Sequence, residues 1–224
     1  MRAGELNPWW RIGLLLTLPL VRGSFRVRLA GLEHVPSTGP AILAFNHVSA
    51  LDGPVLAIEV AWRLRRQTRF LVAEEFFERR RTRWILRSYE QIPVLRGEGN
   101  DAALDRAIET VRRGAMAAIS PEGQVNDGEL TELQRIRSGV ARVALPTGAP
   151  IVPVGIWGTQ HRWPRSGLRY GPPWRPRLAL AFGNPILPAG EPGSNDAVAH
   201  LTDRLRDRLA AQVAQARAMT GEIV

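Results

Sequence analysis

The 224-residue sequence contains no cysteine, no lysine and only 4 histidines. The absence of cysteine excludes disulfide bonds, thiolate metal ligands and cysteine nucleophiles, and nothing in the composition argues for export. So few histidines do not favour a histidine-based metal cluster, and we expect neither a metal site nor a bound cofactor. The lack of lysine means that all 30 basic residues are arginines.

These arginines outnumber the 21 acidic residues and give a formal net charge of +9. A guanidinium grips phosphate and carboxylate groups through a fixed fork of donors, so this charge suits nucleic acid, anionic lipid or a phosphorylated co-substrate. A GC-rich genome also places arginine where others have lysine, so the charge alone does not identify the partner. The length fits one domain, or one domain with a small appendage.

Long hydrophobic runs are missing as well. The apolar run Ile12–Val21 has only about ten residues between two arginines, whereas a bilayer span needs about 20. No small-residue cleavage site follows this run, so it does not read as a secretory signal. The sequence therefore predicts neither a spanning helix nor a signal peptide.

The same N-terminal segment has the features of a helix. Asn7 is suited to cap its start, and Pro19 is expected to close it. Trp9 and Trp10 carry amphipathic rings of the kind that lie at lipid headgroup level. Residues 1–23 therefore predict a short membrane-interfacial helix, with an ordinary helix packed on the domain as the alternative.

Further along, short apolar runs alternate with helical patterns, which is typical of an α/β domain with a mostly parallel central sheet flanked by helices. We assign residues 24–224 to this one domain. Strands are expected at Ser24–Leu29, Ala41–Phe45, Phe70–Ala73, Gln91–Leu95, Ala115–Ser120, Ile151–Trp157 and Leu178–Gly183. Helices are expected at Val55–Leu64, Glu75–Tyr89, Asp101–Arg113, Ile136–Pro146 and Asn195–Met219.

One stretch of this domain, Ala61–Arg96, is unusually basic, with ten arginines against four glutamates. Phe76, Phe77, Trp84 and Ile85 are interleaved at helical spacing. The pattern indicates either an aromatic face with a cationic rim that docks on anionic lipid, or a solvated face over a packed aromatic stripe.

A histidine and an aspartate follow the expected strand Ala41–Phe45. His47 and Asp52 are five residues apart, which on a continuous helix separates them by about 140°. They meet if the chain turns between them, and Ser49 and Gly53 favour a turn. Asp52 then accepts one ring N–H of His47, and the other ring nitrogen is free to take a proton from an attacking hydroxyl. Alternatively, His47 is a plain strand-end residue and Asp52 a helix cap.

Other polar groups are expected at the same sheet edge. Glu122 and Gly123 follow another apolar run, and a short strand delivers Arg96 there too, where it would hold a phosphate. A plain turn and a surface ion pair are the alternatives. Ser49 lies two residues from His47, but no Gly-x-Ser-x-Gly turn occurs in the sequence, which disfavours a serine hydrolase.

Taken in order, these motifs resemble a known family. The four motif blocks of the glycerolipid acyltransferases, typified by the 1-acylglycerol-3-phosphate O-acyltransferases, are matched by Asn46-His47-(x4)-Asp52, Ile92-Pro93-Val94-x-Arg96, Pro121-Glu122-Gly123 and Ile151-Val152-Pro153-Val154. Arg137-Ser138-Gly139 also fits, and the resemblance covers roughly residues 26–190. Several weak motifs in register make a strong signal.

The resemblance implies an O-acyltransferase that moves a fatty acyl group from acyl-CoA or acyl-carrier protein to the hydroxyl of a lysophospholipid or related lipid. His47 would be the general base and Asp52 its orienting partner, without a covalent enzyme intermediate. Substrate contacts are expected from Asn46, Ser49, Arg96, Glu122, Gly123 and Arg137. Such a protein would lie on the cytoplasmic face of the membrane, as a peripheral or monotopic protein.

The third block departs from the family pattern. Val125 stands where the family has an arginine that binds acceptor phosphate, and Ser120 replaces an aromatic residue. Unless Arg96 or Arg137 substitutes, a glycolipid, another lysolipid or a non-phosphorylated alcohol is the expected acceptor. Two alternative functions are a basic nucleic-acid-binding module and a non-catalytic lipid-binding relative. Because no nucleic-acid motif is present, no nucleic acid partner is expected.

Overall fold

The centre of the molecule is a seven-stranded sheet, within residues 6–94, 101–126, 132–169 and 171–222, which the computed structural model describes. The strands are β1 (Arg26–Ala30), β2 (Ala41–Phe45), β3 (Thr68–Ala73), β4 (Ile92–Val94), β5 (Met116–Ile119), β6 (Ile151–Trp157) and β7 (Arg177–Phe182). Their order is β1-β7-β6-β2-β5-β3-β4. The pair β6–β7 is antiparallel and the other strand pairs of these residues are parallel, as the sequence predicts.

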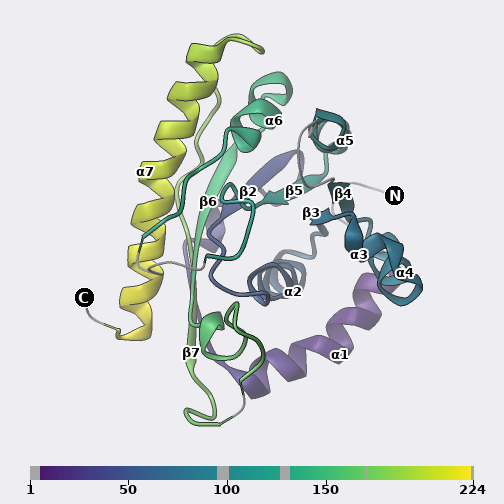
Figure 1. Cartoon of the computed structure of the whole chain (residues 1–224), viewed down its shortest axis with the longest axis vertical. Helices are drawn as coiled ribbons and strands as arrows, with labels where there is room; N and C mark the ends of the chain where they lie inside the picture. Colours follow the sequence, from purple (N-terminus) through teal and green to yellow (C-terminus); the bar gives the residue numbers. More distant parts are fainter. Residues whose placement is uncertain (1–5, 95–100, 127–131, 170, 223–224) are drawn as a thin grey trace.

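Helices cover both faces of this sheet (Figure 1). They are α1 (Pro8–Ser24), α2 (Asp52–Leu64), α3 (Glu75–Glu78), α4 (Arg80–Ser88), α5 (Asp101–Arg112), α6 (Gly139–Thr147) and α7 (Asn195–Thr220), with short 3-10 helices η1 (Leu32–His34) and η2 (Thr159–His161). Successive residues of β2 point to opposite faces. Leu43 therefore packs in the core with Leu56 of α2, whereas Ile42 packs in the core with Leu205 of α7. The expected single α/β domain is confirmed.

Two local expectations differ from the structure. The expected helix Glu75–Tyr89 is divided into α3 and α4, because the backbone of Arg79 is extended (φ −77°, ψ 124°). Pro19 does not close α1, which continues to Ser24. A proline inside a helix destabilises it by about 3 kcal/mol. Here the last turn is held by the burial of Val21 and by the ion pair of Arg22 with Glu59 of α2.

Helix α1 is packed on one side and exposed on the other. The Asn7 side chain accepts a hydrogen bond from the Trp10 backbone N–H, as expected for its cap. Trp10, Leu14 and Val21 belong to the core that also contains the sheet. The outward side carries the exposed apolar residues Trp9, Ile12, Leu15, Leu16 and Leu20. Among the described helices, none combines the length and apolar character that a bilayer crossing requires.

The sheet topology brings three chain segments to one place. Strand β2 lies between β6 and β5 and runs parallel to both, so the carboxyl ends of these strands share one edge. His47 follows β2, Glu122 follows β5 and Thr159 follows β6. In parallel α/β sheets this edge is where ligand sites are built.

Candidate active site

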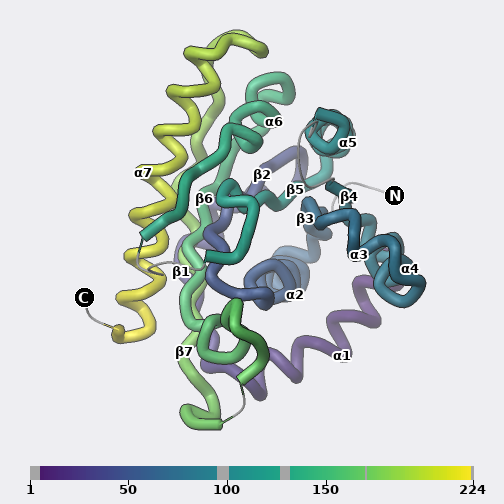
Figure 2. The backbone as a smooth tube through the Cα atoms, in the orientation of Figure 1, coloured from purple at the N-terminus to yellow at the C-terminus, as the bar shows by residue number. Residues whose placement is uncertain are grey.

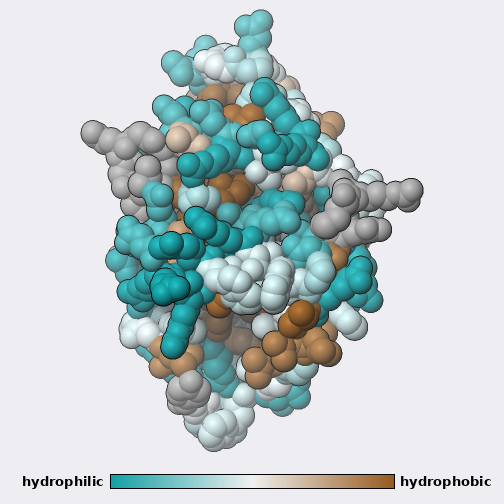
Figure 3. Space-filling view, turned by 90° about the vertical axis from the view of Figure 1, so that its right-hand side faces the viewer, coloured by the Kyte–Doolittle hydropathy of each residue, from teal (hydrophilic) through white to brown (hydrophobic). Residues whose placement is uncertain are grey.

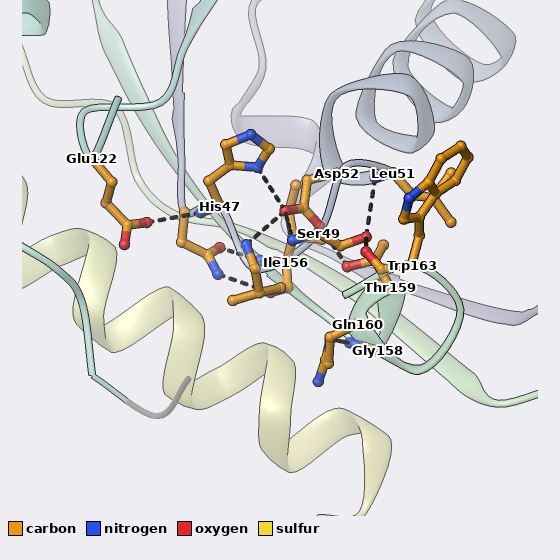
Figure 4. A network of polar contacts seen from close by, with 12 residues as sticks. His47, Ser49, Leu51, Asp52, Glu122, Ile156, Gly158, Thr159, Gln160 and Trp163 are labelled. Carbon is orange, nitrogen blue, oxygen red and sulfur yellow. Dashed lines mark hydrogen bonds and ion pairs between the residues drawn. The ribbon is translucent and has the colours of Figure 1, made fainter. Parts of the chain in front are cut away.

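His47 and Asp52 meet at this edge (Figure 4). The Nδ1 atom of His47 lies 3.0 Å from Oδ2 of Asp52. The His47 side chain is 23% exposed, whereas that of Asp52 is completely buried. The ring packs edge-on against Phe45, with the ring centroids 6.0 Å apart. One ring nitrogen is therefore held by the carboxylate, and Nε2 lies on the far side of the ring from it (Figure 4).

The turn between the two residues is built around the Asp52 carboxylate. Its Oδ2 atom also accepts hydrogen bonds from the backbone N–H groups of Val48 and Ser49, each at 2.7 Å. Asp52 is the first residue of α2, and the positive end of that helix favours a carboxylate there. The same carboxylate therefore closes the turn and orients the imidazole.

Thr159 completes the surroundings of Asp52. The Thr159 hydroxyl donates to Oδ1 of Asp52, the oxygen that does not face His47. Thr159 is fully buried. Asp52 thus receives four donors, two from the backbone, one from an imidazole and one from a hydroxyl. A buried carboxylate whose donors are all in place keeps one orientation.

Ser49 has a role in the same turn. Its hydroxyl donates to the backbone carbonyl of Trp163 at 2.6 Å and accepts from the Leu51 N–H at 3.0 Å. Because Ser49 is fully buried and its hydroxyl is engaged by the protein, it ties the turn to the segment after β6. Both hydrogen bonds of this hydroxyl are made within the protein, and the expected contact of Ser49 with substrate stays a prediction.

Asn46 is bonded to the neighbouring strand. Its side-chain Nδ2 donates to the carbonyl of Ile156 at 3.0 Å, and its Oδ1 accepts from the N–H of Ile156 at 2.7 Å. The residue is 1% exposed. Since both polar atoms are bound to β6 and the side chain is buried, Asn46 fastens β2 to β6. Its expected contact with substrate stays a prediction.

Glu122 lies beside His47 at the end of β5. Its Oε1 atom accepts the backbone N–H of His47 at 2.8 Å, and Oε2 accepts that of Gln134 at 3.1 Å. Burial raises the pKa of Glu122 above its usual value, although these two hydrogen bonds act in the opposite direction. Glu122 therefore holds the His47 main chain in place, in addition to lining a groove.

Gly123 and Arg137 are brought together next to Glu122. Gly123 has a φ of +75°, a conformation that favours glycine. A Cβ atom built on it would lie 3.3 Å from Cζ of Arg137, so the guanidinium rests against this turn. Arg137 is exposed and borders the groove of about 660 Å³ that Glu122 also lines. Arg96 lies outside the described residues.

Sequence reasoning missed Thr159, the residue that binds the far oxygen of Asp52. The only available signal was its position just after the strand Ile151–Trp157, at the edge where His47 and Glu122 were expected. Thr159 is 107 residues from Asp52, so no local pattern connects the two.

A buried carboxylate that holds one nitrogen of a partly exposed imidazole, at the carboxyl edge of a parallel sheet, defines an α/β protein equipped for proton transfer. Comparison with known families is consistent with that class. The family model Acyltransferase matches residues 26–157, which is more than half of the chain. The chain belongs to the acyltransferase family.

The sequence is also similar to individual proteins. An uncharacterized protein of Mycobacterium tuberculosis is 29% identical over an alignment of 228 residues. The alignment covers 83% of this chain and 60% of that protein. A chloroplastic 1-acyl-sn-glycerol-3-phosphate acyltransferase of Arabidopsis thaliana is 28% identical over 139 residues, 60% of this chain and 37% of that protein. The chain therefore spans less than two thirds of the length of each of these relatives.

The fold has a solved counterpart. The crystal structure of the 1-acyl-sn-glycerophosphate acyltransferase PlsC from Thermotoga maritima superposes with a TM-score of 0.71. The match covers 92% of this chain and 79% of that one, at 21% sequence identity. The mostly parallel sheet flanked by helices is thus a fold that this chain shares with PlsC.

Proposed function

We propose that the chain is an O-acyltransferase that moves a fatty acyl group from acyl-CoA or acyl-carrier protein to the hydroxyl of a lysophospholipid or a related lipid. The observation that carries the proposal is the His47–Asp52 pair, with Nδ1 held at 3.0 Å and the ring partly exposed. No bound cofactor is required, because the thioester donor is itself a co-substrate.

In the proposed reaction, Nε2 of His47 takes the proton of the acceptor hydroxyl as its oxygen attacks the thioester carbonyl. Asp52 stabilises the imidazolium that forms and keeps Nδ1 as the protonated nitrogen. When the tetrahedral intermediate collapses, the C–S bond breaks and the thiolate leaves. The imidazolium then returns its proton to the thiolate, so the enzyme ends in its starting state.

The groups around His47 support this assignment of roles. Glu122 and the turn at residues 48–52 fix the histidine from both sides, so the base is pre-organised before substrate arrives. Gly123 and Arg137 line the substrate side of the turn, and Arg137 is the cation placed to meet a polar headgroup. With Asn46 and Ser49 engaged by the protein, backbone N–H groups are the remaining candidates for stabilising the oxyanion.

The test is acyl transfer from labelled acyl-CoA to a panel of lysolipids and simple alcohols, with products separated by chromatography. We expect His47→Ala to lower kcat by about 100-fold or more, since that is the contribution of a general base. His200→Ala is the matched control, because His200 is exposed on α7, and it should keep wild-type activity. A His47→Ala protein that is folded and within a few-fold of wild type would refute the role.

We further propose that the protein works as a peripheral protein on the cytoplasmic face of an anionic membrane. Trp9 of α1 packs against Trp84 of α4, with ring centroids 4.7 Å apart, so the two helices form one surface. Further exposed apolar residues follow Trp9 along α1, and exposed arginines lie on α4 (Arg80, Arg81 and Arg87) and at its start (Arg79). On this side of the molecule, hydrophobic side chains gather in the lower part, with hydrophilic ones around them (Figure 3).

Vesicle sedimentation tests this second proposal. Leu15 and Leu16 are 76% and 64% exposed, and burying each in lipid is worth about 1.5–3 kcal/mol. Leu15→Glu/Leu16→Glu should therefore bind vesicles that contain anionic lipid at least tenfold more weakly. Leu187→Glu, at a leucine 67% exposed outside α1 and α4, is the control. Equal binding by the two variants would contradict the proposed surface.

A further inference from the structure

A groove of about 660 Å³ lies between residues 134–138 and the first turns of α7. Figure 2 shows the segment after residue 132 running beside α7 on its way to α6. The volume falls within the range of roughly 300–1,000 Å³ that small-molecule and cofactor sites occupy. Asn195 and Thr202 of α7 form one wall, and Glu122 lies at the end nearest His47.

The charged residues of this groove differ in how far the protein already engages them. Its two carboxylates are already engaged: Glu122 accepts two backbone N–H groups, and Asp203 forms an ion pair with Arg206 at 2.6 Å. Arg135 and Arg137, on the opposite wall, are both exposed. Within the described residues neither guanidinium has a hydrogen-bond or ion-pair partner. The groove is therefore lined by two guanidinium groups that have no partner in the part of the chain that the structure describes.

The groove is next to the reacting groups. The Arg137 guanidinium rests against Gly123, and the adjacent Glu122 is bonded to the His47 backbone at 2.8 Å. The first residue of α7, Asn195, also lines it, and the start of a helix carries a partial positive charge. A ligand anchored here would lie beside Glu122, the residue that accepts the His47 backbone N–H.

We infer that this groove binds a phosphate group of one of the two substrates, through Arg135 and Arg137. A guanidinium fork matches two phosphate oxygens, which makes arginine well suited to such a ligand. The inference rests on the proposed function for its ligand, since the nucleotide end of acyl-CoA and a phosphorylated acceptor headgroup both carry phosphate.

Direct binding tests the inference without catalysis. Adenosine 3′,5′-bisphosphate stands for the nucleotide end of CoA and glycerol 3-phosphate for an acceptor headgroup, each titrated by calorimetry into the full chain. Arg135→Gln/Arg137→Gln should weaken the binding of one probe by about tenfold or more, since each lost contact involves two charged partners. Arg204→Gln/Arg208→Gln removes the same charge from the exposed side of α7, outside the groove, and should change Kd less than about twofold.

The titrations with the two probes identify which substrate's phosphate the groove binds. Loss of bisphosphate binding, with a raised KM for acyl-CoA alone, assigns the groove to the donor, and loss of glycerol 3-phosphate binding assigns it to the acceptor. The inference is overturned if wild type binds neither probe at millimolar concentration. It is also overturned if the groove variant binds as wild type does, or if the control variant loses as much. Those outcomes leave the acyl transfer itself untouched, because the His47→Ala comparison judges it separately.

Discussion

Replacing Thr159 with valine removes one hydroxyl from the surroundings of Asp52 and keeps a side chain of similar size. A hydrogen bond to a charged group is worth about 1.5–3 kcal/mol. Asp52 retains its donors from Val48, Ser49 and His47, so we take the lower value. The imidazolium of the transition state needs a correctly oriented carboxylate. If the transition state loses the whole of this stabilisation, kcat falls about tenfold.

The steady-state kinetics of acyl transfer separate this positioning role from a general loss of structure. We expect Thr159→Val to lower kcat and to leave KM for donor and acceptor within about twofold, because Thr159 is buried behind Asp52 and touches neither substrate. Thr159→Ser restores the hydroxyl and should recover most of the activity. Thr147→Val, whose hydroxyl bonds only to neighbouring groups of α6 and its end, is the control and should keep wild-type kcat.

Two results would refute this reasoning. If Thr159→Val kept kcat within about twofold of wild type, the fourth donor to Asp52 would be irrelevant to catalysis. If Thr159→Ser were as impaired as the valine variant, the site would be sensitive to shape and not to the hydroxyl. Thermal melting of all four proteins shows whether a lower rate reflects a smaller folded fraction.

Two further predictions concern stability. Burial raises the pKa of Glu122 above its usual 4.5, so this group contributes stability that is fully present below pH 4.5 and is lost as pH rises through the folded-state pKa. Glu122→Gln should therefore gain stability relative to wild type from about pH 4 to pH 7 in urea unfolding, and a constant difference would contradict the sign. At Gly155, a Cβ atom would lie 2.0 Å from the carbonyl oxygen of Gln212 in α7. Gly155→Ala should lower the free energy of unfolding by about 1–3 kcal/mol or more. The control is Gly23→Ala, which has no atom within 4 Å of its Cβ and should not destabilise the protein. Equal unfolding midpoints for the two variants would refute the close approach of Gly155 to α7.

Much of this fold could be predicted because local sequence patterns specify its helices and strands. The run Ile151–Trp157 is apolar throughout, which is typical of a strand buried on both faces, and β6 has those bounds. The separation of His47 and Asp52 by a turn was also a local matter. Local patterns were less reliable where tertiary contacts compete, as at Pro19, where burial of the following turn keeps α1 helical against the preference of proline.

By itself, the sequence determined the α/β class, the order of the strands along the chain and the meeting of an imidazole with a carboxylate five residues later. Only the tertiary structure decided their order across the sheet, the engagement of Asn46 by β6, the hydroxyl of Thr159 on Asp52 and the groove between residues 134–138 and α7. The physical reason is distance along the chain. A turn of six residues is specified by its own hydrogen bonds, whereas contacts between residues 107 or 110 positions apart exist only after the whole sheet has assembled.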